Sequence, residues 1–421
     1  MDIIQITSIL IVLAGLFGTF NYLYLKLPAA IGILVVSLVA SFLILGVDLM
    51  LPDLGIGVTV RTTVTDIHFS DALLEGMLGL LLFAGALHVS LDQLRAQALP
   101  VLLMATIGVA LSTVIAGTAF SLVTGMPLLI ALVFGALISP TDPVAVLGVL
   151  RQANLRESLE TKIAGESLFN DGVGYVVYLI LVALAFPVAG GHATTLSDAG
   201  LLFVQEAIGG ALLGGILGWL TFQLMKRVDD YSLEVLLTLG LAFGGYSLSL
   251  ALHVSAPIMA VVAGLFIGHV GTRYGMSKVT RSYVDGFWKL VDEILNAVLF
   301  LLIGVEVFAV AFSADILLAG TAAIAIALVA RLAAVAVPVL MLRPFRRQER
   351  DVIPVMTWGG LKGGISIALA LALPDGEWKP LILGATYCVV IFSIIVQGLT
   401  VAPLARRLAA SAWMHRDEDE V

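Results

Sequence analysis

Five ionisable side chains lie within long apolar stretches of this 421-residue sequence. On insertion scales, a charged residue at the centre of a bilayer helix costs about 2.5 to 3.5 kcal/mol, so such residues usually serve a function. Charged groups kept at this depth typically bind ions, relay protons or pair with one another. The candidate functional site therefore consists of Asp142, Glu166, Asp171, Arg331 and Lys362.

One apolar segment carries most of the oxygen ligands of a candidate cation site. Ser167 and Asp171 are four residues apart, which places them on one face of a helix. Glu166 and Asn170 have the same spacing and share the adjoining face. Carboxylate, hydroxyl and amide oxygens, with backbone carbonyls freed at Thr141, are hard ligands that suit a small alkali cation. The sequence predicts a monovalent cation bound by Asp171, Ser167 and Thr141, with Asn170 beside them.

Asp171 is the residue that we expect to carry both the ion and the proton. Burial favours its neutral acid, whereas a bound cation favours the carboxylate, so proton and cation compete for one site. If only a loaded carboxylate can cross the membrane, the two opposite fluxes are coupled. Asn170 does not titrate and supplies no second proton. We therefore predict electroneutral exchange of one proton for one monovalent cation.

The composition indicates a membrane protein. Apolar residues make up 60% of the chain, charged residues 12%, and the mean hydropathy is +1.07, which excludes a soluble enzyme, a nucleic-acid-binding protein and a disordered protein. Lipid offers the backbone no hydrogen bonds, and the chain lacks the alternation of a β-barrel, so we expect an all-α polytopic fold. Thirteen segments could span a bilayer: 3–25, 29–50, 71–90, 99–124, 126–150, 159–188, 200–225, 232–252, 255–271, 286–310, 313–342, 351–374 and 379–408.

The thirteen segments divide into two inverted six-helix repeats, with 200–225 as the linker between them. The fifth segment of each repeat is interrupted at its middle. The sequence SPTDP at 139–143 contributes two prolines, and GGLKGG at 359–364 contributes four glycines. Paired interruptions at corresponding positions predict two crossed broken helices with a binding site near the bilayer midplane.

Crossed broken helices place partial charges at this site, because half-helix N-termini are positive and C-termini are negative. We expect Asp142 to offset the positive ends and Arg331 the negative ends. An unpaired buried charge is costly, so Glu166 and Lys362 are expected to form a buried ion pair that braces their two helices. The alternative is that each is solvated separately in a water-filled funnel.

The distribution of Lys and Arg sets the orientation. An odd number of spans places the termini on opposite sides, and a cytoplasmic C-terminus leaves only Arg61 and Lys379 among the loop cations outside. The N-terminus is then outside. The first segment lacks the features of a cleaved signal peptide and is expected to remain as a span. Residues 409–421 are expected to form a short, disordered cytoplasmic tail.

Four motifs resemble those of the NhaP/NHE-type monovalent cation:proton antiporters. Residues 141–146 read TDPVAV, 165–172 read GESLFNDG and 358–363 read WGGLKG. A fourth match, NAVLF followed by LIGVE, lies within 296–306. The motifs agree with the family in order and spacing, and the likeness covers almost the whole chain.

The resemblance implies a homodimer with two domains in each protomer. It implies a dimerisation domain, 1–98 with 200–312, and a core domain, 99–188 with 313–408. The core domain of the family moves like an elevator between inward- and outward-facing states. In the family the aspartate matching Asp171 binds ion and proton, the residues matching Thr141 and Ser167 help to coordinate the ion, and the asparagine matching Asn170 accompanies electroneutral exchange.

Two residues depart from the family pattern. The family pairs Glu166 with an arginine at the position of Lys362, whereas lysine lacks the planar bidentate fork and weakens the expected pair. Ala84 stands where many relatives carry an acidic residue that is an ion ligand or supports one. The ion selectivity of the family is therefore not transferred to this chain.

These features predict a secondary active transporter, not an enzyme, that exchanges Na⁺, or Li⁺, for H⁺ in the bacterial inner (plasma) membrane. Its partners are these ions, the lipid bilayer and a second copy of the chain, with no nucleic acid and no cofactor. A K⁺/H⁺ antiporter of the same fold is the alternative. A cation channel could use the same carboxylates but needs no titrating aspartate between broken helices. An intramembrane hydrolase is disfavoured because Ser139 and Ser167 have no nearby histidine.

Overall fold

The computed structural model describes residues 3–51, 53, 60, 62, 69–142, 146, 156–186, 196–310, 313–344 and 351–419. Every regular element within these ranges is a helix, and ten of the described helices are long and apolar enough to cross a membrane. The all-α polytopic prediction is therefore confirmed for the described chain, which is an integral membrane protein. Arg61 and Pro143 lie outside the described residues.

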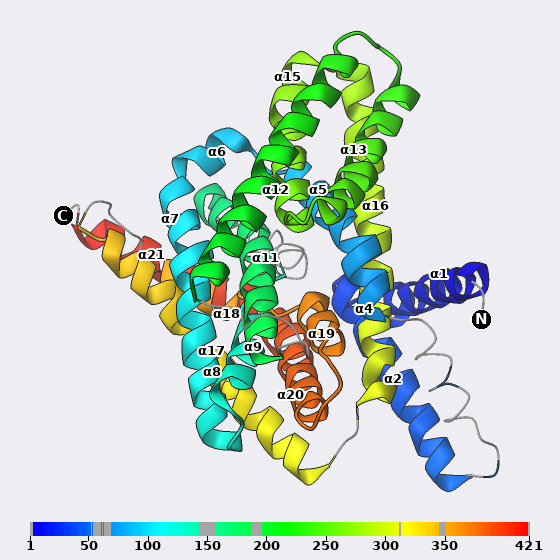
Figure 1. Ribbon diagram of the computed structural model, residues 1–421, viewed down its shortest axis with the longest axis vertical. Coiled ribbons are helices and arrows are strands. Elements are labelled where there is room, and N and C mark those ends of the chain that lie inside the picture. Colours follow the sequence, from blue (N-terminus) through cyan, green and yellow to red (C-terminus); the bar gives the residue numbers. More distant parts are fainter. Residues whose placement is uncertain are drawn as a thin grey trace.

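The helices run through both halves of the chain (Figure 1). The first half contains α1 (Ile3–Phe20), η1 (Asn21–Leu25), α2 (Ala29–Met50), α4 (Phe69–Asp71), η3 (Ala72–Met77), α5 (Leu78–Leu87), α6 (Leu91–Ala96), α7 (Ala98–Leu103), η4 (Met104–Gly108), α8 (Val109–Thr124), α9 (Leu128–Leu137) and α11 (Glu157–Ala185). The second half contains α12 (Leu196–Met225), α13 (Tyr231–Ala251), α14 (Ala256–Phe266), η6 (Ile267–Gly271), α15 (Thr272–Tyr274), α16 (Lys278–Val305), η7 (Glu306–Ala309), α17 (Ala314–Leu342), α18 (Val352–Trp358), α19 (Gly364–Leu371), α20 (Lys379–Phe392), η8 (Ser393–Gln397) and α21 (Gly398–Asp419). Five spans include a π-helical segment: η1, η3, η4, η6 and η8.

Three of the thirteen expected segments are not among the ten apolar spans. The segment 286–310 comprises the last part of the long helix α16, which begins with several charged residues, and the short helix η7. The segment 126–150 contains α9, which ends at Leu137. The segment 351–374 consists of two short helices, α18 and α19, with a non-helical stretch between them. In the first of the two segments expected to be broken, the helix ends before Pro140, and residues 143–145 and 147–150 lie outside the described residues. The second segment is interrupted at its glycines.

Buried apolar side chains form two clusters that sit in different parts of the molecule. The first lies among α8, α9, α17, α19 and α20, with Phe120 stacked on Phe134 at a ring-centroid distance of 4.0 Å. The second lies among α5, α13, α14 and the first half of α16, where the rings of Phe83 and Trp288 lie 4.7 Å apart, centroid to centroid. In Figure 1, α12, α13 and α15 occupy the upper part of the view, and α8, α9 and α20 the lower part.

Local capping explains where several helices begin. The side chain of Ser277 accepts a hydrogen bond from the Thr280 amide, and the Ser277 amide donates one to Thr280 Oγ1, which forms a capping box at the start of α16. Asp230, Ser255 and Ser313 accept amide hydrogen bonds at the starts of α13, α14 and α17. Each cap satisfies an amide that would otherwise lack a partner at the end of its helix.

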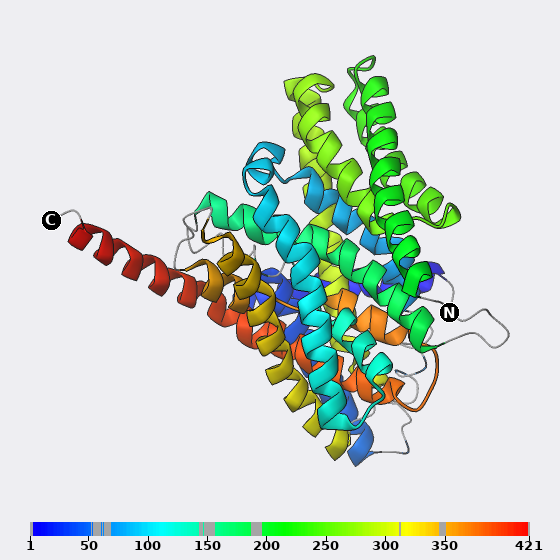
Figure 2. The same cartoon turned by 60° about the vertical axis from the view of Figure 1, so that its left-hand side comes forward.

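The C-terminal end corrects one expectation. Residues 409–421 were expected to be disordered, but helix α21 continues to Asp419 and extends away from the body of the molecule (Figure 2). The stretch after Pro403 is rich in alanine, leucine and arginine, which have high helix propensity and allow the last span to continue as a helix.

Candidate functional site

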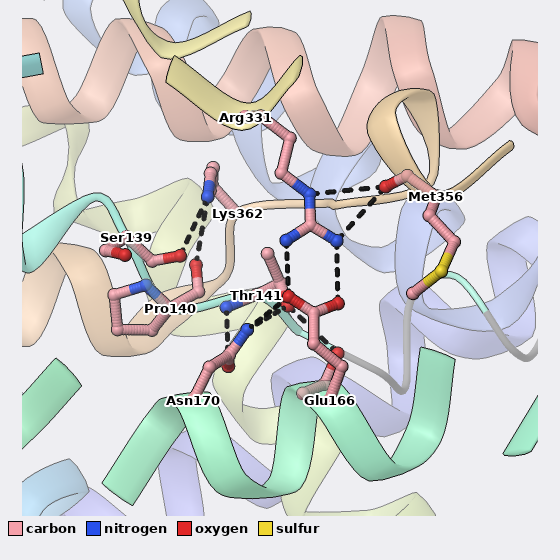
Figure 3. A network of polar contacts seen from close by, with 9 residues as sticks. Ser139, Pro140, Thr141, Glu166, Asn170, Arg331, Met356 and Lys362 are labelled. Carbon is pink, nitrogen blue, oxygen red and sulfur yellow. Dashed lines mark hydrogen bonds and ion pairs between the residues drawn. The ribbon is translucent and has the colours of Figure 1, made fainter. Parts of the chain in front are cut away.

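The two interrupted helices meet at the candidate site, as the sequence predicted (Figure 3). Residues 139–142, which follow α9, are not helical, and we call them the first break. Residues 359–363, between α18 and α19, are also not helical and form the second break. The amide of Asp142 donates a hydrogen bond of 2.8 Å to the carbonyl of Leu361. The amide of the first break and the carbonyl of the second break, neither of which has a partner within a helix, therefore satisfy each other.

Two glycines of the second break leave space for charged side chains. A Cβ atom at Gly360 would lie 2.1 Å from Nε of Arg331, and one at Gly363 would lie 2.6 Å from Oδ2 of Asp142. Any larger residue at either position would displace the charged group. Because Gly363 caps α19, the Asp142 carboxylate lies at the positive end of that helix, which agrees with its expected role.

Glu166 pairs with Arg331 rather than with Lys362, which corrects the sequence-based expectation. Both Nη atoms of Arg331 donate to the Glu166 carboxylate, Nη1 to Oε1 and Nη2 to Oε2, the latter at 2.7 Å. Nε and Nη2 of Arg331 also donate to the carbonyl of Met356, at 3.2 and 3.1 Å. The guanidinium has the planar fork that fits a carboxylate, and it reaches Glu166 from α17 across Gly360. It thus links α11, α17 and the negative end of α18.

Lys362 has a different set of partners. Its ammonium donates to the carbonyl of Ser139 at 3.0 Å and to that of Pro140 at 3.3 Å. These carbonyls follow the C-terminus of α9, where a cation is favourable. Lys362 therefore connects the second break to the first. In place of the expected ion pair with Glu166, its ammonium makes hydrogen bonds to two backbone carbonyls.

Asn170 is committed to the scaffold of the site. Its Nδ2 donates to Thr141 Oγ1 at 2.8 Å and to Glu166 Oε1 at 3.0 Å, and its Oδ1 accepts from the Thr141 amide at 3.3 Å. The amide side chain thereby joins the Glu166–Arg331 pair to the first break. The amide donates to the carboxylate and accepts from the backbone without titrating.

Asp171 differs from its neighbours because its carboxylate is not fully satisfied. The residue is 4% exposed, and its Oδ1 has no hydrogen-bond partner in the part of the chain that the structure describes. One turn earlier on α11, Ser167 Oγ lies 2.9 Å from Thr141 Oγ1. A buried carboxylate oxygen without a partner is unfavourable unless a proton or a cation binds it. The arrangement can therefore bind either species, with hydroxyl oxygens close by.

The donor set fits an alkali cation better than a transition metal. Within the described ranges, no group of three or more His, Cys, Asp or Glu side chains is placed to hold a metal ion. The oxygens available for such a site are the Asp171 carboxylate and the hydroxyls of Ser167 and Thr141, which are hard ligands. A singly charged cation suits a site with a single free carboxylate.

Two functional candidates escaped the sequence analysis. Ser393 and Gln397, on η8, are buried and make hydrogen bonds to the second break. Their signal in the sequence is a pair of polar residues four apart inside the apolar segment 379–408. Serine and glutamine are uncharged, so an analysis that starts from buried charge does not find them.

Comparisons with known proteins bear on the family of the chain. The family described as "Sodium/hydrogen exchanger, transmembrane" matches residues 8–407. The Na(+)/H(+) antiporter NhaP of Pseudomonas aeruginosa is 45% identical over 427 residues, covering 99% of each chain. The Na(+)/H(+) antiporter NhaH of Halobacillus dabanensis is 37% identical over 346 residues, covering 81% of this chain and 84% of that protein.

A solved structure has the same fold. The sodium proton antiporter MjNhaP1 from Methanocaldococcus jannaschii at pH 8 superposes with a TM-score of 0.76, covering 97% of this chain and 99% of that chain. The sequences are 19% identical, so this likeness bears on the fold alone. The family match spans nearly the whole chain and includes residues 139–142, residues 359–363 and the Asn170–Asp171 segment. The chain belongs to the sodium/hydrogen exchanger family.

Proposed function

We propose that this protein is a secondary active transporter, not an enzyme, which exchanges Na⁺, or Li⁺, for H⁺ with a stoichiometry of one to one. The observation that carries the proposal is the buried Oδ1 of Asp171, which has no hydrogen-bond partner in the described chain and lies on the helix that faces the crossed breaks. Curated relatives of the chain are named Na(+)/H(+) antiporters, which supports the choice of ions.

Asp171 is the shared carboxylate in this proposal. A cation binds the ionised form together with Thr141 and Ser167 oxygens, and a proton binds the same carboxylate when the cation leaves. Either ligand neutralises the buried charge, so the loaded site can move while an empty, ionised site is held back. Asn170 is fixed by Thr141 and Glu166 and carries no proton, which supports electroneutral exchange.

The remaining charges hold the ligands in place. The Glu166–Arg331 pair links α11 to α17 and α18, and Lys362 links the second break to the carbonyls after α9. Asp142 neutralises the start of α19. With these groups paired within the scaffold, Asp171 is the carboxylate beside the two breaks that is left for transport.

Alternating access is proposed to occur by an elevator-type movement of a core domain, 99–188 with 313–408, against a dimerisation domain, 1–98 with 200–312. The two apolar clusters support a division into two packing units. Side chains cross that division in both directions: α1, α2, α4, η3 and the end of α16 contribute to the first cluster, and α7 and α11 contribute to the second. Large exposed apolar side chains on α1 and α12 suit lipid or a second protomer. We propose a homodimer in the bacterial inner membrane, with the N-terminus outside and the C-terminus in the cytoplasm.

The test measures cation-driven dissipation of an inward-acid pH gradient in proteoliposomes. Wild type is compared with Asp171→Asn and with the control Asp375→Asn, which makes the same change at an almost fully exposed side chain. We expect wild type and the control to respond to Na⁺ and Li⁺, and Asp171→Asn to be silent. A response of Asp171→Asn equal to wild type would contradict the assignment of the carrier.

The same vesicles separate the alternatives. A response to K⁺ alone would identify a K⁺/H⁺ antiporter of the same fold. Current across a planar membrane that follows a Na⁺ gradient would contradict electroneutral exchange. Cation flux that persists without any proton movement would indicate the channel instead of the exchanger.

A further inference from the structure

The last span carries two buried polar residues at a π-helical segment beside the second break. Ser393 is fully buried and Gln397 is 3% exposed. They mark the first and last positions of η8, between α20 and α21. π-helical turns inside α-helices occur frequently at functional sites because they displace the side chains around them.

These two side chains form a continuous hydrogen-bonded clip across the second break. The amide of Lys362 donates to Ser393 Oγ at 2.8 Å, and Ser393 Oγ donates to Gln397 Oε1 at 2.7 Å. Nε2 of Gln397 donates to the carbonyl of Trp358 at 2.9 Å. The clip therefore binds both ends of the break, the last residue of α18 and the lysine that precedes α19.

The membrane makes these bonds important. A broken helix leaves carbonyls at the end of one half and amides at the start of the other without intrahelical partners. At membrane depth, such groups must be satisfied by the protein itself. Ser393 and Gln397 satisfy one group of each kind, which fixes the separation of α18 and α19.

Lys362 connects the clip to the candidate cation site through hydrogen bonds at both its backbone and its side chain. Ser393 fixes the backbone of Lys362, while the lysine ammonium binds the carbonyls of Ser139 and Pro140. Pro140 directly precedes Thr141, whose hydroxyl contacts Ser167. Both ends of Lys362 are therefore anchored, and movement of its backbone changes the position of the first break.

We propose that Ser393 and Gln397 are positioning residues of the cation site. They act through Lys362 to hold the Thr141 oxygens where a cation bound by Asp171 needs them, and so set the cation affinity. This inference rests on the proposed exchange of a cation at Asp171, and it adds the last span to the residues that determine affinity.

The test uses the full-length protein in proteoliposomes, with Na⁺ as the probe. Ser393→Ala and Gln397→Met each remove one step of the clip, whereas Ser393→Thr keeps the hydroxyl. Thr386→Val removes a buried hydroxyl of α20 that has no hydrogen-bond partner among the described residues. The loss of a buried hydrogen bond predicts that Ser393→Ala and Gln397→Met raise the half-saturating Na⁺ concentration about tenfold. We expect Ser393→Thr and Thr386→Val to stay within about twofold of wild type.

A double-mutant comparison tests the route through Lys362. If the clip acts through this lysine, Ser393→Ala should raise the half-saturating Na⁺ concentration much less in a Lys362→Met background, which lacks the donor to the Ser139 and Pro140 carbonyls, than in wild type. Full additivity of the two changes would overturn the proposed route. Melting temperatures in detergent, with and without Na⁺, report on Na⁺ binding even in variants that do not transport.

The outcomes separate a positioning role from a structural one. If Ser393→Ala and Gln397→Met lower the maximal rate and the melting temperature but leave the half-saturating Na⁺ concentration unchanged, the clip is only structural and the proposal fails. It also fails if Thr386→Val has the same effect as Ser393→Ala. Failure of the exchange proposal is recognised separately, because wild type itself would then show no Na⁺-driven proton movement.

Discussion

Removing the charge of Glu166 should destabilise the crossing of the two broken helices. The carboxylate accepts hydrogen bonds from both Nη atoms of Arg331 and from Nδ2 of Asn170, and all three residues are buried. In Glu166→Gln, the new amide group can accept on one atom only and faces the guanidinium with a donor on the other. The Arg331 charge is then left without its counter-ion in a site that also contains Lys362.

The magnitude follows from the burial of the pair. Breaking a buried ion pair by removing one partner costs about 3 to 5 kcal/mol, because the remaining charge stays buried. For a chain of this size, this predicts a fall in melting temperature of ~5 °C. The control Asp375→Asn breaks an exposed ion pair with Lys379 and should change the melting temperature by about 1 °C or less.

The assay is thermal unfolding in detergent, monitored by the fluorescence of the five tryptophans. A double-mutant cycle then asks which cation is the partner. Glu166→Gln is combined with Arg331→Gln and, separately, with Lys362→Met. We expect strong coupling with Arg331 and weak coupling with Lys362. Stronger coupling with Lys362, or a Glu166→Gln variant as stable as Asp375→Asn, would refute the reasoning.

Three further predictions concern the same site. Gly360→Ala should destabilise the protein by about 1 to 3 kcal/mol and abolish exchange, because its Cβ would lie 2.1 Å from Arg331 Nε. Gly376→Ala should be nearly neutral in the same melting and transport assays, because its Cβ would meet no other described residue, apart from its chain neighbours, within 4 Å. Asn170→Asp should lower the melting temperature, since it removes the donor to Thr141 and places a carboxylate against Glu166; a variant as stable as wild type would contradict the scaffold role. If one proton competes with one cation, acidification by one pH unit should raise the half-saturating Na⁺ concentration up to about tenfold and leave the maximal rate unchanged. A maximal rate at saturating Na⁺ that falls on acidification would argue against a shared site.

The sequence was sufficient for features that depend on local chemistry. Continuous apolar segments predict membrane helices because lipid leaves the backbone no other partners. The prolines of 139–143 and the glycines of 359–364 predict breaks because two prolines or four glycines close together in a helix interior strongly disfavour the helix. The spacing of Ser167 and Asp171 predicts a shared helix face because residues four apart in an α-helix lie one above the other. The position of Asp171 as a candidate ligand follows from the high cost of a buried charge.

Only the tertiary structure decided which groups are partners. Arg331 and Lys362 are both buried cations, and the sequence could not show that Arg331 reaches Glu166 across Gly360. The clip formed by Ser393 and Gln397 depends on where the last span packs, since neither residue is unusual in a membrane helix. Pairing depends on the position and direction of side chains that are far apart in the chain, whereas helix formation and helix breaking depend on neighbouring residues. The sequence therefore determined the helices and the candidate charges, and packing determined which charge remains available to bind an ion.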